Sequence, residues 1–268
     1  MTGLPQSHDD GVPKSVATAA AAKERVIVPN QPLVVALPGA LCAPAIFREV
    51  ASHSSLSRTR LVSISWLTEG SSWTLPAVAE RVIARCAEMT DAPVVLAGHS
   101  TGGTVALLAA LEAPERVCGL LLSNTGANMH GHGDVEAVIA GLESDYGPEA
   151  RKQVLDRCFH YAPEPVIREE LDCYASAVAK HAIIDALRSQ LETDLAPRLA
   201  ELSMPVCIAH GQHDRVRPAS HAQFLAKNIP GAEMILLDAG HTPMLERPAA
   251  YARALDSLLK RCPNTSTI

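Results

Sequence analysis

The chain has 268 residues, of which 47% are hydrophobic and 19% are charged, and its formal net charge is −6. This length and composition are typical of one globular domain with room for an inserted subdomain. The negative charge provides no basic footprint for nucleic acid, and the longest apolar runs have the length of a strand, so we expect neither a nucleic-acid partner nor a membrane span.

The two ends of the chain differ in composition from the rest. Residues 1–25 mix Ser, Pro, Asp, Gly and Ala without periodicity, which indicates a flexible arm, and residues 263–268 form a short polar tail. No leucine-rich core precedes a cleavage site near the start, so we expect no secretory signal. The seven cysteines have no paired spacing, which favours reduced thiols and a cytoplasmic location.

Short apolar runs alternate with helical segments between these ends. The runs are continuous, which is typical of strands covered on both faces. The alternation predicts an α/β fold, with a mainly parallel central sheet and helices on both faces. The expected strands are Leu33–Leu37, Arg60–Ser65, Val94–Ala97, Gly119–Ser123, Val206–Ala209 and Glu233–Leu237. The expected helices of this core are Leu75–Glu88, Thr104–Ala113, Ala219–Lys227 and Pro248–Lys260.

Residues 127–198 interrupt the alternation, because they show helical patterns but no convincing strand. We interpret this segment as a helical cap inserted into a core of residues 26–126 and 199–262. Ligands of open α/β sheets bind at the carboxyl ends of the strands, where such a cap would enclose a substrate. The expected cap helices are Val135–Ser144, Glu149–Phe159, Pro165–Ala179 and His181–Glu192.

A serine between glycines follows the third expected strand, in the sequence Gly98-His99-Ser100-Thr101-Gly102. A sharp turn between a buried strand and a helix exposes a serine hydroxyl, and glycines two residues to either side permit that turn. The pattern therefore predicts that Ser100 is a nucleophile. The alternative is a glycine-rich helix start with a capping serine.

A serine nucleophile needs a base and a group that orients the base. His241 follows the last expected strand, and Asp214 follows the one before it, so both lie on loops at the carboxyl end of the sheet. We predict that His241 is the base and Asp214 the orienting acid. Asp238 is closer to His241 in sequence but has the position of a turn residue, and Asn124 at another strand end is an amide without negative charge.

The chain order Ser, Asp, His is that of the α/β-hydrolases, and residues 31–261 resemble that family in its form with a helical cap. The resemblance implies an oxyanion hole made by the N–H groups of Thr101 and Ala40, with Leu41 as the neighbouring option. It rests on four stretches: Leu37-Pro38-Gly39-Ala40-Leu41, Gly98-His99-Ser100-Thr101-Gly102-Gly103, His210-Gly211-Gln212-His213-Asp214 and Ala239-Gly240-His241-Thr242-Pro243.

The sequence departs from the family pattern at two places. Many relatives have His-Gly where this chain has Pro38-Gly39, and the stretch around Trp66 lacks the usual Asp-x-Pro-Gly-x-Gly loop. Trp66 is a candidate for the pocket wall, although packing against the core is the simpler interpretation. The other candidates for substrate contact are Leu41, Met129, His130 and Met244, and the apolar ones among them fit a core position equally well.

Two histidines near an aspartate, in His130-Gly131-His132-Gly133-Asp134, are a possible zinc pattern. No further ligand cluster accompanies them, so we expect a polar entry to the cap, no metal and no cofactor.

The favoured function is a serine hydrolase that cleaves a carboxylic ester, a thioester or a lactone through an acyl-enzyme on Ser100. Its partner would be a small molecule with a carbonyl group, and the low aromatic content of 3% favours an aliphatic or small acyl group. Other chemistry on the same triad, such as carbon–carbon bond hydrolysis, acyl transfer or a lyase reaction, stays open. So does a ligand receptor with a vestigial triad, and the oligomeric state is undetermined.

Overall fold

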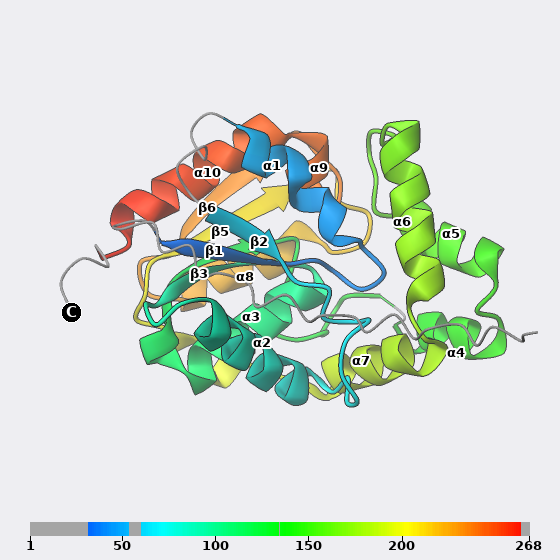
Figure 1. The fold of residues 1–268 in the computed structure, drawn as a ribbon, viewed down its shortest axis with the longest axis horizontal. Coiled ribbons are helices and arrows are strands. Elements are labelled where there is room, and N and C mark those ends of the chain that lie inside the picture. Colours follow the sequence, from blue (N-terminus) through cyan, green and yellow to red (C-terminus); the bar gives the residue numbers. More distant parts are fainter. Residues whose placement is uncertain (1–31, 54–59, 134, 264–268) are drawn as a thin grey trace, which may run out of the picture.

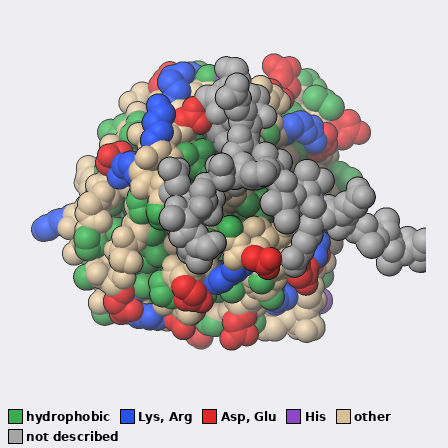
Figure 2. All heavy atoms as spheres, turned by 60° about the vertical axis from the view of Figure 1, so that its left-hand side comes forward, with side chains coloured by type: hydrophobic (Ala, Val, Ile, Leu, Met, Phe, Trp, Pro, Cys, Tyr) green, Lys and Arg blue, Asp and Glu red, His purple; other side chains and the backbone are tan. Residues whose placement is uncertain are grey.

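The computed structural model describes residues 32–53, 60–133 and 135–263. The predicted arm, residues 1–25, lies outside the described residues, as do residues 264–268 of the predicted tail. Acidic and basic side chains lie interspersed over the face shown in Figure 2. Among the described helices, none has the length and apolar character that a bilayer crossing requires.

A six-stranded sheet forms the centre of the fold, and every pair of neighbouring strands is parallel. This confirms the predicted α/β class (Figure 1). The second strand is two residues shorter than expected and the third extends two residues further. In spatial order the strands are β2 (Arg60–Ser63), β1 (Leu33–Leu37), β3 (Val94–His99), β4 (Val117–Ser123), β5 (Val206–Gly211) and β6 (Glu233–Leu237).

Helices cover both faces of the sheet (Figure 1). Every residue of β1, β3, β4 and β5 is buried, as continuous apolar runs in a covered parallel sheet predict. One face is covered by α1 (Arg48–Ser52), α9 (Pro243–Glu246) and α10 (Pro248–Arg261). The other face is covered by α2 (Leu75–Met89), α3 (Thr101–Glu112) and α8 (Ala219–Asn228).

Four helices lie between β4 and β5 in sequence, and no strand occurs among the described residues there. Figure 1 shows them beside the core, beyond the carboxyl ends of the strands. They begin and end within a few residues of the expected positions. These helices are α4 (Val135–Ser144), α5 (Pro148–Asp156), α6 (Pro165–Ala177) and α7 (Lys180–Glu192).

Candidate active site

Ser100 occupies a strained turn between β3 and α3. Its φ of 52° lies in the left-handed region, which residues other than glycine seldom adopt. The Ser100 N–H donates to the carbonyl of Ser123 at 2.9 Å, and the Thr125 hydroxyl donates to the carbonyl of Ser100 at 2.7 Å. The backbone of β4 and the residues after it therefore hold the strained conformation in place.

Two glycines of the predicted elbow permit close contact between backbones. A Cβ on Gly98 would lie 2.6 Å from the Cα of Gly103, and a Cβ on Gly102 would lie 2.3 Å from the carbonyl oxygen of Leu37. Real Cβ atoms do not approach other atoms so closely, so each position requires glycine. The contacts also fix α3 against the end of β1, where the expected oxyanion loop begins.

Asp214 and His241 meet at the carboxyl ends of β5 and β6. His241 Nδ1 lies 2.8 Å from Asp214 Oδ2, and both side chains are almost completely buried. Nδ1 carries the proton in this contact, because an ionised carboxylate only accepts hydrogen bonds. His241 Nε2 is then the ring nitrogen that can accept a proton.

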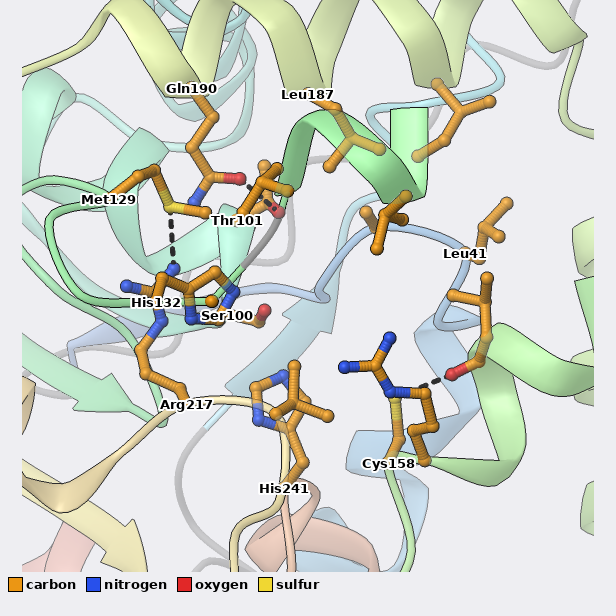
Figure 3. A pocket seen from close by; sticks show the side chains of 18 of the residues that line it. Leu41, Ser100, Thr101, Met129, His132, Cys158, Leu187, Gln190, Arg217 and His241 are labelled. Atoms are coloured by element: carbon orange, nitrogen blue, oxygen red, sulfur yellow. Dashed lines mark hydrogen bonds between the residues drawn. The ribbon is translucent and has the colours of Figure 1, made fainter. Parts of the chain in front are cut away.

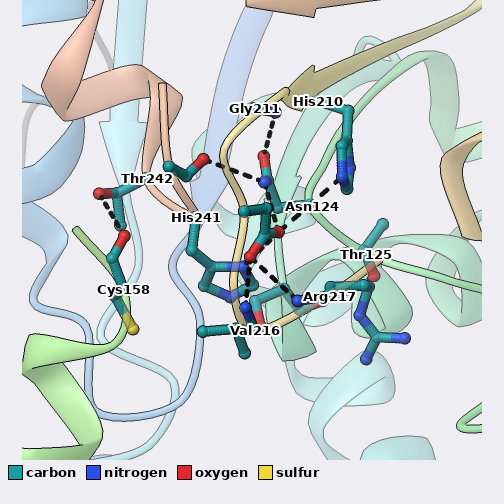
Figure 4. A network of polar contacts seen from close by, with 12 residues as sticks. Asn124, Thr125, Cys158, His210, Gly211, Val216, Arg217, His241 and Thr242 are labelled. Atoms are coloured by element: carbon teal, nitrogen blue, oxygen red, sulfur yellow. Dashed lines mark hydrogen bonds and ion pairs between the residues drawn. The ribbon is translucent and has the colours of Figure 1, made fainter. Parts of the chain in front are cut away.

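Three further donors, from Asn124, Val216 and Arg217, contact the Asp214 carboxylate, and Figure 4 shows these three residues beside His241. Asn124 Nδ2 donates to Oδ2 at 2.6 Å, and the N–H groups of Val216 and Arg217 donate to Oδ1 at 2.7 and 2.9 Å. Burial alone would raise the pKa of Asp214. The contact with His241 and these hydrogen bonds outweigh burial and hold that pKa well below its ordinary value. Asp214 is therefore ionised at neutral pH.

The competing carboxylate, Asp238, faces away from this contact. It is about half exposed and pairs with His213 Nε2 at 3.0 Å and with Arg247 at 2.9 Å. Its surface position agrees with its expected place in a turn. Asn124 follows the end of β4, the other strand end considered for the acid, and it donates a hydrogen bond to Asp214.

The loop of His241 is held by the connection between α5 and α6. The His241 N–H donates to the carbonyl of Cys158 at 3.0 Å. The Glu246 carboxylate accepts the N–H groups of His160, Tyr161 and Gly240 at 3.1, 2.9 and 3.1 Å. The helical segment thus fixes the loop that carries the candidate base.

The loop after β1 is held by two aromatic side chains. Trp66 Nε1 donates to the carbonyl of Pro38 at 2.8 Å, and the Gly39 N–H donates to His99 Nδ1 at 3.1 Å. Because Nδ1 accepts, the His99 proton resides on Nε2, which donates to the carbonyl of His241 at 2.9 Å. His99 therefore links the loop of Gly39 to the loop of His241 through a single buried ring.

A cavity of about 140 Å³ lies above Ser100 (Figure 3). It brings Ser100 and His241 together with Ala40 and Thr101 from the expected oxyanion hole, and with two of the expected contact residues, Leu41 and Met129. Helices α4, α5 and α7 supply much of its wall. The residues that they contribute include Val135, Val138, Leu142, Val154, Ile183, Leu187 and Gln190.

Three of the expected contact residues lie outside this cavity. Trp66 is 2% exposed because its ring packs in the core, where its N–H holds the loop at Pro38. Met244 is fully buried in the core near the start of α9. His130 is exposed and lines a separate surface hollow with Asp194 and Phe224. Trp66 therefore takes the core position that the sequence favoured, Met244 takes the core position that the sequence left open, and His130 lies away from this cavity.

Several polar side chains of the cavity were missed by the sequence reasoning. Gln190 on α7 accepts the hydroxyl of Thr101 at 2.9 Å and donates to Thr104 at 3.2 Å. His132 and Arg217 also line the cavity. Burial and the charge of Arg217 lower the pKa of His132 to about 3, so His132 is neutral.

The histidine pair 130 and 132 does not complete a metal site. Over the described part of the chain, no group of three or more His, Cys, Asp or Glu side chains is arranged to hold a metal ion. His132 instead packs edge-on against His221, with ring centroids 6.0 Å apart.

Comparison with known proteins agrees with this architecture. A family model described as "Alpha/beta hydrolase family" matches residues 34–254. A pimeloyl-[acyl-carrier protein] methyl ester esterase of Neisseria meningitidis serogroup B is 26% identical over 178 residues, covering 62% of this chain and 69% of the relative. A 3-oxoadipate enol-lactonase 2 of Acinetobacter baylyi is 27% identical over 168 residues, covering 61% and 62% of the two chains.

Solved structures show the same fold. The enol-lactonase from Burkholderia xenovorans LB400 superposes with a TM-score of 0.77 at 20% identity, covering 86% of this chain and 92% of that one. The family model alone covers most of the described residues, and the parallel sheet has the expected form. The chain belongs to the alpha/beta hydrolase family.

Proposed function

We propose that Ser100, His241 and Asp214 form the catalytic triad of a hydrolase that cleaves carboxylic esters, thioesters or lactones. The observation that carries the proposal is the buried contact of 2.8 Å between His241 Nδ1 and Asp214 Oδ2, beside the cavity that Ser100 lines. It leaves Nε2 of the imidazole available to take the serine proton, as a triad requires.

The reaction follows from these groups. His241 Nε2 takes the Ser100 proton as Oγ attacks the carbonyl carbon, and the ionised Asp214 stabilises the imidazolium that forms. The leaving alcohol or thiol departs with that proton, which gives an acyl-enzyme. Water then attacks the acyl group, gives a proton to His241 and releases the acid, and the proton returns to Ser100.

The developing oxyanion would be held by the N–H groups of Thr101 and Ala40. Thr101 is the first residue of α3, where a backbone N–H has no helical acceptor, and Ala40 lines the same cavity. Loss of one such donor typically costs about 3–4 kcal/mol of transition-state stabilisation. The link from Gly39 through His99 to His241 supports a fixed position for this loop.

We infer that residues 127–198 act as a cap that encloses the substrate over a core of residues 26–126 and 199–262. The side chains that α4, α5 and α7 contribute to the cavity wall support this role. A cavity of about 140 Å³ suits a small acyl group, since an engineered cavity of ~150 Å³ accommodates benzene. The chemistry needs no cofactor. All seven cysteines are free thiols, which favours a reducing compartment such as the cytoplasm.

Labelling by a fluorophosphonate tests the activated serine. We expect the wild type to be labelled and Ser100→Ala to resist the label. Turnover is then measured on short p-nitrophenyl esters, acyl-thioesters and lactones. A folded wild type that resists the label contradicts the proposal. Turnover of a diketone but of no ester would indicate carbon–carbon bond hydrolysis, and saturable binding without any turnover would indicate a receptor.

A further inference from the structure

Arg217 is a buried cation whose partners in the described structure are weak. It is 1% exposed and lines the cavity above Ser100 (Figure 3). One guanidinium nitrogen donates to the carbonyl of Asn128 and to His221 Nδ1, both at 3.3 Å. The other donates to the thioether of Met129 at 3.0 Å, and Nε has no hydrogen-bond partner within the protein.

No carboxylate among the described residues forms an ion pair with this guanidinium. The charge of Asp214 acts on Arg217, whose backbone N–H it accepts, but His241, Asn124 and two N–H groups already occupy the oxygens of that carboxylate. Burial lowers the pKa of Arg217 to about 10 despite the opposing charge of Asp214, so the guanidinium still carries its charge at neutral pH. Burying a charge without a paired counter-charge is costly.

The surroundings keep space for this guanidinium. A Cβ on Gly126 would lie 2.8 Å from a terminal nitrogen of Arg217 and 2.6 Å from Nδ1 of His221. Any larger residue at position 126 would displace both side chains. The arginine is thus held in a prepared position at the cavity wall.

The charges of the cavity wall are one-sided. The described lining includes Arg217 and the exposed Arg157 but no Asp or Glu, and the lowered pKa of His132 keeps that ring neutral. An anionic group entering the cavity would meet a positive charge with which no carboxylate of the described residues is directly paired. Nε has no partner, and the terminal nitrogen that donates to Met129 has a second hydrogen, so the guanidinium keeps two neighbouring donors that can bind a carboxylate through parallel hydrogen bonds.

We propose that Arg217 binds a carboxylate of the substrate, so that the enzyme acts on esters or lactones that carry a second, free carboxylate. The inference rests on the proposed hydrolase function and adds the substrate class to it. The cavity size limits the spacer between the two groups to a few carbons. The hydrophobic wall from α4 and α7 would contact that spacer.

Matched pairs of esters test the preference. Mono-p-nitrophenyl glutarate against p-nitrophenyl butyrate places the carboxylate on the acyl side, and 4-acetoxybenzoate against phenyl acetate places it on the leaving group. Wild type should favour the charged member of one pair by roughly 10- to 100-fold in kcat/KM, the range for a hydrogen bond to a charged group. Equal values within both pairs would overturn the inference.

Two variants assign the preference to this residue. Arg217→Met removes the charge and keeps an unbranched side chain, so the charged-to-neutral ratio should fall to near one through a higher KM for the charged ester. The control Arg215→Gln removes the same charge two residues away on the exposed surface and should keep the wild-type ratio. Arg217→Lys, which keeps the charge but not the fork, should give an intermediate ratio. A wild-type ratio in folded Arg217→Met or Arg217→Lys would contradict the proposal.

Calorimetry separates the two proposals. Ser100→Ala should bind glutarate, bind its neutral diamide at least ~10-fold more weakly, and lose glutarate binding when combined with Arg217→Met. Glutarate binding without labelling or turnover of wild type would leave the anion site standing and reject the hydrolase. Ester turnover with no charge preference and no glutarate binding would support the hydrolase and reject the anion site. Binding of inorganic phosphate but not of glutarate would also overturn the carboxylate assignment.

Discussion

The two walls of the cavity are built in different ways. On the core side, Ser100 and His241 follow the ends of β3 and β6, and Asp214, which contacts His241, follows the end of β5; backbone groups hold all three in place. On the other side, helices α4, α5 and α7 contribute side chains such as Leu142, Val154 and Leu187.

The proposed triad lies on the first wall and the proposed cap forms the second, so we propose that chemistry and specificity are divided between them. Strand ends in a parallel sheet are fixed by hydrogen bonds that do not depend on side-chain identity, so the reacting groups keep their geometry. The helical wall depends on which side chains it presents, so substitutions there change the size and charge of the cavity without altering the sheet.

The largest effect is expected for Asp214, the carboxylate that we propose orients the base. Asp214→Asn should lower kcat about 10⁴-fold, because an amide stabilises the wrong tautomer of His241 and carries no charge for the imidazolium. The matched control is Asp238→Asn, which changes a half-exposed carboxylate in the neighbouring turn. The kcat of both variants is measured on one short ester. An equal, small effect of the two changes would show that Asp214 is not the acid.

A smaller effect is expected for the ring that connects two loops of the core wall. His99→Leu leaves the buried N–H of Gly39 and the carbonyl of His241 without their partner, at about 1–3 kcal/mol for each group. We expect lower stability in urea and a fall in kcat that exceeds any rise in KM, because both catalytic loops lose their link. His99→Gln, which offers an acceptor and a donor, should recover part of the loss. A stability loss with unchanged kcat would limit His99 to a structural role.

The contrast between the walls also describes what the sequence could predict. The apolar runs, the glycines at 98 and 102 and the strand-end position of Asp214 depend on local chain geometry, and each was recognisable from spacing. The sheet and its order of elements are confirmed by the structure. The contact of Asp214 with His241 stays a proposal about catalysis, although its geometry matches the expectation.

The rest depended on packing between distant segments. From the sequence, Trp66 and Met244 could line the pocket or pack in the core, and their neighbours in space decide for the core. Gln190 reaches α3 across 89 residues of sequence, and no local pattern marks that contact. Arg217 looks like an ordinary surface arginine in sequence, and its burial follows only from how β5, the segment after β4 and α8 pack together.

The attachment of the helical wall to the core can be tested at Gln190. Gln190→Met keeps the volume but removes both hydrogen bonds to Thr101 and Thr104, which should lower the free energy of unfolding by about 1–3 kcal/mol. The exposed Gln153→Met on α5 is the control and should stay within about 0.5 kcal/mol of wild type. Chemical denaturation measures both. Equal stability of the two variants would show that this contact does not hold α7 to the core.

The smallest effect concerns pH and the histidine beside Arg217. Burial and the charge of Arg217 lower the pKa of His221 from 6.5 to about 4 in the folded protein. Between these two values the unfolded chain binds a proton on His221 and the folded chain does not. The stability contributed by this site is therefore complete above pH 6.5 and is lost as pH falls towards 4.

His221→Asn keeps an acceptor for the Arg217 guanidinium but does not titrate, so its stability should fall less steeply than that of wild type over this range. Urea unfolding at several pH values compares the two slopes, with His130→Asn as a control at an exposed histidine. Asp214 also stabilises the folded protein less as pH falls, because its pKa is lower in the folded chain than in the unfolded chain. This loss occurs at more acidic pH than the loss at His221. If stability falls with pH as steeply in His221→Asn as in wild type, His221 is not the group that takes up the proton, and burial and Arg217 do not lower its pKa as expected.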